Sequence, residues 1–197
     1  MSQRGRRTSQ DRTINRRPQI PRILIVCEGE RTEPDYFSQF KVTTTVKGEA
    51  MNTLSQVERT IFLRDEDRRF DQVWCVFDLD SFPKQNFEKA IQLAKKENIR
   101  VAYSNEAFEL WYVLHFDYLQ SQVDRRQYIT ILESRLGIGY SKNDRTIYER
   151  LLSRQPQAIA NAERLLEEHH LHHLYSSDKK PSTTVHELVL ELNKYIK

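Results

Sequence analysis

Short apolar runs rich in β-branched residues alternate with stretches of helical period between residues 23 and 103, and this alternation is the strongest constraint on the fold. Such an order is typical of parallel βαβ units, because parallel strands need a long crossover connection that is usually a helix. The pattern predicts strands at 23–27, 41–46, 72–79 and 99–103, a helix start at 32–35 with Thr32 as its N-cap, and helices at 53–64 and 86–97. We therefore predict an α/β fold with a mostly parallel four-stranded sheet flanked by helices.

After residue 106 the sequence shows helical period only. It predicts helices at 107–116, 125–136, 144–152, 156–168 and 184–196, with 182–184 as a loop that ends in an N-cap for the last helix. A length of 197 residues suits one α/β domain with a helical extension better than two full domains. The expected organisation is a basic tail over 1–21, an α/β domain over 22–116, and a helical region over 117–197 packed on the same domain.

The net charge of +3 hides a strongly basic N-terminus. Residues 1–22 hold seven arginines and one acid, a net charge of +6, and the rest of the chain carries −3. With almost no apolar residues this segment cannot form a core, so we predict a disordered tail. Arginine without lysine suits bidentate phosphate contacts, which makes the tail a candidate nucleic-acid contact; the alternative is a solubilising leader without a partner. The candidate contact residues are Arg4, Arg6, Arg7, Arg12, Arg16 and Arg17.

Neither a membrane location nor a cysteine framework is indicated. No apolar run approaches the roughly 20 residues that span a bilayer, and the N-terminus lacks the apolar stretch of a secretory signal, so we expect a cytoplasmic protein. Cys27 and Cys75 both fall within predicted strands and have no CxxC neighbour. Buried free thiols are therefore a better interpretation than a disulfide or a cysteine zinc site.

Three acids stand where two predicted strands end. Glu28 follows the first strand, and Asp78 and Asp80 stand at the end of the third in VFDLDSF. Ligands of open parallel sheets bind beyond the carboxyl ends of the strands, and residues two apart on a strand point to one face. If the first and third strands are neighbours, the three carboxylates meet and repel one another unless a cation neutralises them. Hard oxygen ligands of this kind suit Mg²⁺ or Mn²⁺.

Further charged residues are weaker candidates for the same site. Glu109 lies in the most apolar helix of the chain and must be paired, bound to metal or turned to a wet face. Lys142, between two predicted helices, can offer a cation to a phosphate or can be a solvated loop lysine. Glu33 is interpreted as a helix-start acid and Glu30 as solvated, while His115 is interpreted as a packed, hydrogen-bonded histidine.

The acid-glycine turn after the first strand and the later DxD resemble the Toprim pattern of topoisomerases, primases and overcoming-lysogenization-defect nucleases. Four ordered blocks narrow this to a resemblance to the RloB family: CEGERTEPDYF, FDLDSF, NEAFELWYVLHF and KPSTTVHELV. The resemblance covers nearly everything from residue 22 to the C-terminus. One departure is Glu106, where family members often have proline, and it affects the expected geometry of that loop.

What this resemblance implies is a Toprim-fold protein of phage-defence and abortive-infection loci, encoded beside an AAA/ABC-type ATPase of the RloA kind. The implied chemistry is metal-dependent cleavage of nucleic acid, whether DNA, RNA or tRNA. Glu28 matches the Toprim glutamate, and Asp78 and Asp80 match the DxD pair. These residues would hold one or two Mg²⁺ or Mn²⁺ ions, or Glu28 would act as a general acid or base beside metal held by the two aspartates.

Two alternatives from other classes remain open at this stage. In a phosphatase similar to haloacid dehalogenases, Asp78 would attack phosphorus and Asp80 would donate a proton. That interpretation leaves Glu28 without a role, and Phe82 stands where the phosphatase pattern needs threonine or serine. In the second alternative the protein is a non-catalytic subunit that binds nucleic acid or docks on an ATPase.

Overall fold

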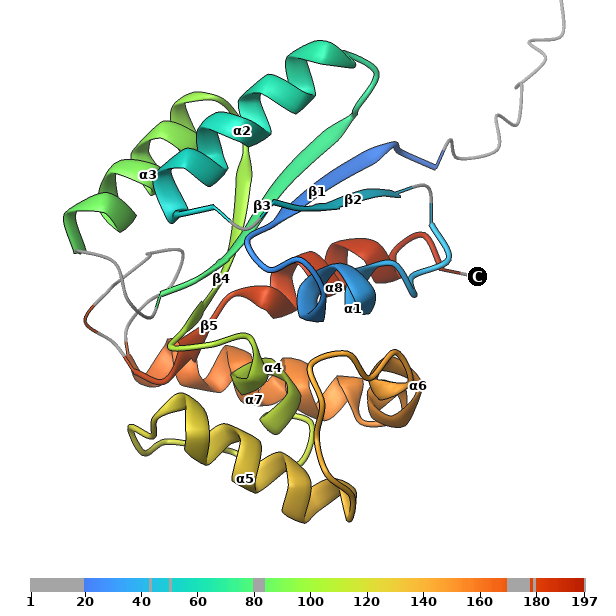
Figure 1. Ribbon diagram of the computed structural model, residues 1–197, viewed down its shortest axis with the longest axis vertical. Helices are drawn as coiled ribbons and strands as arrows, with labels where there is room; N and C mark the ends of the chain where they lie inside the picture. The colour runs from blue at the N-terminus through green and yellow to red at the C-terminus, as the bar shows by residue number, and fades with distance from the viewer. Residues whose placement is uncertain are drawn as a thin grey trace, which may run out of the picture.

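The computed structural model describes residues 20–42, 44–49, 51–79, 84–169, 178 and 180–196, without the side chains of residues 84 and 85. In this part of the chain, five strands form one sheet in the order β2-β1-β3-β4-β5 (Figure 1). The strands are β1 (Ile23–Cys27), β2 (Thr44–Gly48), β3 (Gln72–Asp78), β4 (Arg100–Asn105) and β5 (Ser182–Thr183). The first four are mutually parallel, and β5 is antiparallel to β4. The predicted α/β class with a mostly parallel sheet is confirmed, and it is consistent with a Toprim-like fold.

β1 is an interior strand, and its sequence explains its place. It pairs with β2 on one side and β3 on the other, and every residue from Ile23 to Cys27 is buried. An uninterrupted apolar run is what a parallel strand covered on both faces requires. Cys27 on β1 and Cys75 on β3 are both buried and free, as the sequence predicted.

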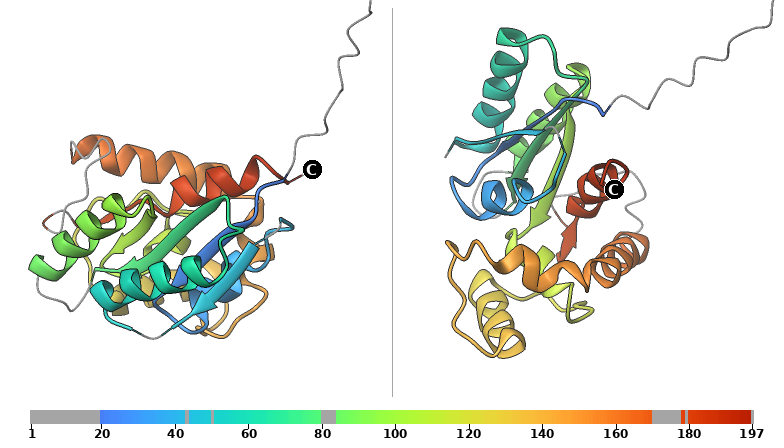
Figure 2. Two further views of the ribbon diagram at one scale, coloured as in Figure 1. Left: turned by 90° about the horizontal axis from the view of Figure 1, so that it is seen from above. Right: turned by 90° about the vertical axis from the view of Figure 1, so that its right-hand side faces the viewer.

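Helices cover both faces of the sheet (Figures 1 and 2). They are α1 (Thr32–Phe37), α2 (Thr53–Glu66), α3 (Lys84–Lys96), α4 (Glu109–Val113), α5 (Arg125–Leu136), α6 (Ile147–Leu152), α7 (Gln155–Glu168) and α8 (Val185–Asn193). On one face α2 and α3 pack with Leu24 and Val26. On the other face α1 and the helices α4 to α8 form a larger core with Ile23 and Ile25. The alternation of side chains along β1 therefore supplies both cores.

No helix in the part of the chain that the structure describes is long and apolar enough to cross a membrane.

Several element boundaries differ from the prediction because local hydrogen bonds end or delay an element. β2 begins at Thr44 and not at Lys41, since the chain first turns, with the Thr44 amide donating to the Val42 carbonyl at 2.8 Å. α6 begins at Ile147 and not at Asp144, because the Asp144 carboxylate accepts from the Thr146 amide and hydroxyl in a turn. α4 is shorter than predicted, ending at Val113.

The prediction of helices alone after residue 106 is wrong at β5. Ser182 and Thr183 pair with the end of β4, where the sequence analysis expected a loop. The following residue, Thr184, is the N-cap of α8 as predicted, but its hydroxyl makes no cap bond. Instead it accepts from the Tyr103 amide of β4 at 3.0 Å. The C-terminal region therefore extends the sheet at its edge.

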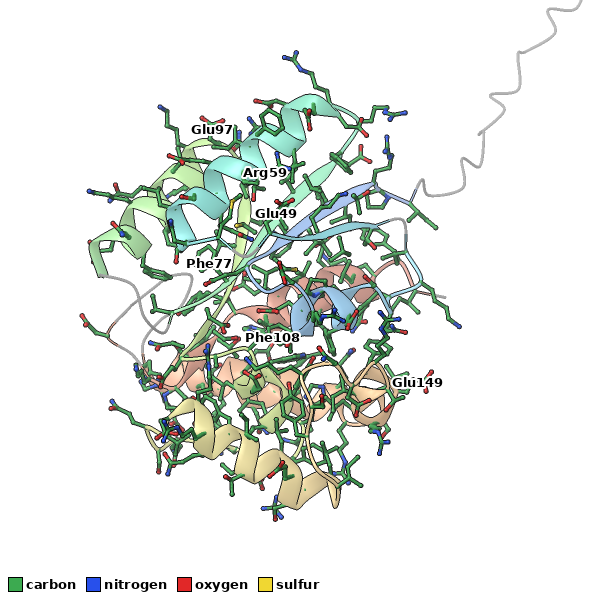
Figure 3. All side chains as sticks on the ribbon, in the orientation of Figure 1. Glu49, Arg59, Phe77, Glu97, Phe108 and Glu149 are labelled. Atoms are coloured by element: carbon green, nitrogen blue, oxygen red, sulfur yellow. The ribbon has the colours of Figure 1, made fainter. Side chains whose placement is uncertain are left out.

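The connection from β2 to α2 is held by a charged pair. Arg59 on α2 lies beside Glu49, the residue after β2, as Figure 3 shows, with its Nε 3.2 Å from the Glu49 Oε2.

Close backbone packing fixes the end of β2. A Cβ on Gly48 would lie 2.5 Å from the Gly29 carbonyl oxygen, so the end of β2 packs directly against the loop that follows β1. That loop carries the first of the acids at the sheet edge.

Candidate active site

Glu28 and Asp78 lie side by side at the carboxyl edge of the sheet. β1 and β3 are hydrogen-bonded neighbours, so the residue after β1 meets the last residue of β3. The Asp78 amide donates to the Glu28 Oε2 at 3.1 Å, which ties the glutamate side chain to the end of β3. This edge is where ligands of open parallel sheets bind.

Part of the predicted site lies outside the described residues. β3 ends at Asp78, and Asp80, the second aspartate of the DxD pair, is not described. Its convergence with Asp78 therefore stays a prediction. The same holds for the candidate nucleic-acid contacts of the tail, which are Arg4, Arg6, Arg7, Arg12, Arg16 and Arg17.

A cavity of about 550 Å³ opens at this edge of the sheet. Acids and cations from separate segments line it. The lining includes the acids Glu28, Glu30, Glu33, Asp78 and Glu109, the cations Arg31, Arg125 and Lys142, and Phe108 beside Glu109. In Figure 3, Phe108 lies between the sheet and the helices below it. The cavity thus combines a polar wall at the sheet edge with the aromatic start of the α4 region.

Glu33 lines this cavity with a buried side chain, although the sequence analysis interpreted it only as a helix-start acid. It does lie in the first turn of α1, yet its side chain is only 5% exposed. Burial raises the pKa of Glu33, and the Glu109 carboxylate raises it further, while Lys142 and Arg125 act in the opposite direction. A Cβ on Gly29 would collide with the Glu33 carboxylate, so the glycine in the loop makes room for the acid. That glycine is the signal from which sequence analysis could have placed Glu33 in the site.

Asp78 is a second acid of the site whose pKa is raised. Burial raises the pKa of Asp78 well above its usual value, and the carboxylates of Glu33, Glu109 and Glu28 add to this effect. The Arg125 guanidinium opposes this shift in pKa, and its Nη2 lies 3.0 Å from the Asp78 Oδ2. An acid in these surroundings either keeps its proton or needs a positive partner.

Arg125 is a site residue that the sequence analysis missed. It opens α5, whose start is fixed by a capping box in which the Asp124 side chain accepts from the amide of Gln127 and the Gln127 side chain accepts from the Asp124 amide. This capping pattern can be read from sequence and places the residue correctly at the helix start. Its partner on β3 is set by how α5 packs in the fold, for which the sequence carries no local signal.

Glu109 and Lys142, both candidates from sequence, lie together in the cavity. Glu109 is buried at the start of α4, and the Lys142 Nζ is 3.7 Å from its Oε1. The Tyr140 hydroxyl donates to the same oxygen at 3.4 Å. The loop between α5 and α6 therefore contacts the Glu109 carboxylate through two side chains. The catalytic roles of the two residues stay predictions.

Two other sequence candidates lie apart from the acids. His115 is buried, its Nδ1 lies 2.9 Å from the Trp111 carbonyl oxygen, and burial lowers the pKa of the imidazole to about 4. It is the packed, hydrogen-bonded histidine that the sequence predicted. Glu106 is the residue at which the sequence departs from the pattern of the family that it resembles. It follows a cis peptide bond after Asn105, and its Oε2 lies 3.6 Å from the Lys180 Nζ.

The side chains at this edge of the sheet are chemically of the kind that binds a hard divalent cation. The carboxyl groups of Glu28, Glu33, Asp78 and Glu109 share one cavity, where burial, followed by the neighbouring carboxylates, raises the pKa of Asp78. Carboxylate oxygens are the ligands that Mg²⁺ and Mn²⁺ prefer. Among the described residues, no three His, Cys, Asp or Glu side chains are grouped closely enough to hold one ion. Asp80 is not among these residues.

Comparison with known proteins gives one match. A family model described as RloB-like protein matches residues 23–192. The match begins with the first residue of β1 and ends within α8, so it includes both the sheet and the C-terminal helices. No curated protein and no solved structure matches the chain significantly.

Proposed function

The chain belongs to the RloB-like family, and from this premise we propose that it is a Mg²⁺- or Mn²⁺-dependent nuclease that cleaves phosphodiester bonds of nucleic acid. One observation carries the proposal. Carboxyl groups from four separate segments, Glu28, Glu33, Asp78 and Glu109, line one cavity at the carboxyl edge of a parallel sheet. The resemblance to the Toprim nucleases of the overcoming-lysogenization-defect kind supports the same reaction class.

The acids divide by position into two groups. Glu28 and Asp78, joined at the strand ends, would hold a divalent ion together with the predicted ligand Asp80. A bound ion of this kind stabilises the charge on the attacking and leaving oxygens of a phosphodiester. Glu33 and Glu109 are more deeply buried, and their carboxyl groups would complete the ligand set or hold a proton beside the reacting phosphate.

The cations of the cavity and the tail would contact the substrate. Lys142 is 53% exposed and pairs with Glu109 at 3.7 Å, so a small movement of its side chain brings the ammonium to a phosphate in the cavity. The arginines within residues 1–19 would bind the phosphate backbone beyond it. We propose that the biological setting is defence against phage beside an AAA/ABC-type ATPase, on the basis of the family resemblance.

A cleavage assay tests the proposal. Purified full-length chain is incubated with plasmid, single-stranded DNA and tRNA in Mg²⁺, Mn²⁺ or EDTA, beside the variants Asp78→Asn and Glu28→Gln. We expect cleavage only with metal, and a loss of roughly a hundredfold or more in both variants, since removal of a charged group that stabilises a transition state commonly costs this much. Asp65→Asn is the matched control, because Asp65 is an exposed acid on α2 that pairs with Arg64.

A binding subunit without turnover is the second candidate function, and one observation favours it. Asp78 and Glu109 each have a cationic partner from the chain itself, so part of the acidic charge is already offset. Such a protein would retain nucleic-acid affinity in the wild type and in Asp78→Asn but would cleave nothing, with or without an added ATPase. A phosphatase would instead hydrolyse a small phosphomonoester and form an acyl-phosphate on Asp78, leaving Glu28 without a role.

A further inference from the structure

Arg125 connects the helical region to the acids at the sheet edge. Its Nη2 lies 3.0 Å from the Asp78 Oδ2, and its side chain is 36% exposed, so the guanidinium contacts both the acid and the cavity. We propose that Arg125 neutralises Asp78 while no metal is bound, and that a divalent cation displaces the guanidinium, which then binds a phosphate of the substrate. This inference rests on the proposed function and deepens it, because it assigns a residue to the recognition of the phosphate.

The backbone of Arg125 is held firmly, so only its side chain needs to move. The capping box between Asp124 and Gln127 fixes the first turn of α5. Farther along the helix, Tyr128 and Leu132 are buried in the larger core. A change of side-chain torsion angles is therefore enough to carry the guanidinium from the carboxylate into the cavity.

Electrostatic repulsion explains why the Arg125–Asp78 ion pair and a metal ion bound to Asp78 exclude each other. Ionised Asp78 faces the carboxyl groups of Glu28, Glu33 and Glu109, so it needs a cation when the site is free of metal. A divalent ion on Asp78 would stand within a few ångströms of the guanidinium, and like charges at that distance repel strongly in a partly buried site. The metal and Arg125 therefore compete for one carboxylate.

The released guanidinium has a suitable new partner in the same cavity. Its planar array of N–H donors matches the oxygens of a phosphate group, and it forms bidentate contacts that an ammonium cannot make. The predicted result is a site that holds the phosphate only after the metal is in place. Arg125 then acts as a positioning residue for Asp78 in the metal-free protein and as a phosphate contact in the loaded protein.

Titration calorimetry with Mn²⁺ tests the competition without relying on activity. The full-length chain is compared with Arg125→Gln, with Arg125→Lys, and with the matched control Arg126→Gln, which removes an exposed arginine one residue along the same helix. Arg125→Gln should bind Mn²⁺ roughly three- to tenfold more tightly, because a partly exposed ion pair no longer competes. Arg126→Gln should stay within about twofold of the wild type, because exposed charges are largely screened.

A second arm measures the affinity for a phosphorothioate DNA oligonucleotide in saturating Mn²⁺. Arg125→Gln should bind this probe several-fold more weakly than the wild type does. Arg125→Lys keeps the charge, so it should return the Mn²⁺ affinity to near the wild-type value but restore the oligonucleotide affinity only in part. Circular dichroism checks folding, and Arg125→Lys retains the oligonucleotide test if the glutamine variant does not fold.

The outcomes separate this inference from the proposed function. If the wild type binds Mn²⁺ and Arg125→Gln binds it equally well or more weakly, the exchange is wrong, while the metal site itself stands. Equal oligonucleotide affinity in wild type and Arg125→Gln would overturn the phosphate contact. A wild-type chain that shows no Mn²⁺ binding would overturn the proposed function and, with it, the exchange.

Discussion

Replacing Glu33 with glutamine should stabilise the metal-free protein at neutral pH and leave its stability unchanged in acid. The carboxyl group is 5% exposed, and burial followed by the nearby Glu109 carboxylate raises its pKa from the ordinary value of 4.5. Glutamine has nearly the same shape and carries no charge. The substitution therefore removes the cost of ionisation while keeping the packing against Gly29.

The sign of the effect follows from proton linkage. Below pH 4.5 the Glu33 carboxyl is protonated in both the folded and the unfolded chain, so it adds no pH dependence. As the pH rises above that value, the unfolded chain ionises more readily than the folded chain, and stability is lost until the pH passes the raised pKa of the folded state. Each unit of elevation corresponds to about 1.4 kcal/mol. We therefore expect Glu33→Gln to be more stable than the wild type at pH 7, by an amount set by how far the pKa of the folded state lies above 4.5.

Thermal unfolding in EDTA at pH 4 and pH 7 measures this difference. For a chain of this size, about 1 kcal/mol corresponds to an increase of roughly 2–4 °C in Tm. Glu30→Gln is the matched control, because Glu30 is exposed in the loop just before α1 and its replacement should leave both Tm values within about 1 °C of the wild type. Equal stability of Glu33→Gln and wild type at pH 7, or a gain of the same size at pH 4, would refute the reasoning.

Three further predictions concern the fold and the tail. Gly48→Ala should lower the free energy of unfolding by about 1–3 kcal/mol in urea, because its Cβ would meet the backbone of the loop after β1, whereas Gly139→Ala, with its nearest atom 4.0 Å away, should change it little. His115 and His186 should titrate near pH 4 in NMR spectra, since burial lowers the pKa of both imidazoles. Stability should fall as the pH drops from 6.5 toward 4, because the unfolded chain binds these protons first; titration of the folded protein at 6.5 would contradict this. Deleting residues 1–19 should reduce the slope of log K against log salt by up to about five for duplex DNA, and an unchanged slope would exclude the tail from the interface.

The elements that sequence reasoning predicted well are those with strong local signals. The bounds of β1 and α5 agree with the prediction, because an uninterrupted apolar run defines one and a capping signal followed by helical period defines the other. Glu28 and Asp78 were placed at strand ends by the same reasoning. Parallel strands share a carboxyl edge, but the two acids meet only because β1 and β3 are neighbours, which the sequence left open and the structure shows.

Tertiary structure decided the remaining features, since they depend on segments far apart in the chain. β5 is two residues long and has no periodicity of its own, so only its pairing with β4 makes it a strand. The contact of Arg125 with Asp78 depends on how α5 packs against the rest of the helical region. Glu33 reads as an ordinary helix-start acid until the surrounding elements bury it, because burial is a property of what packs over a side chain and not of the residues beside it in sequence.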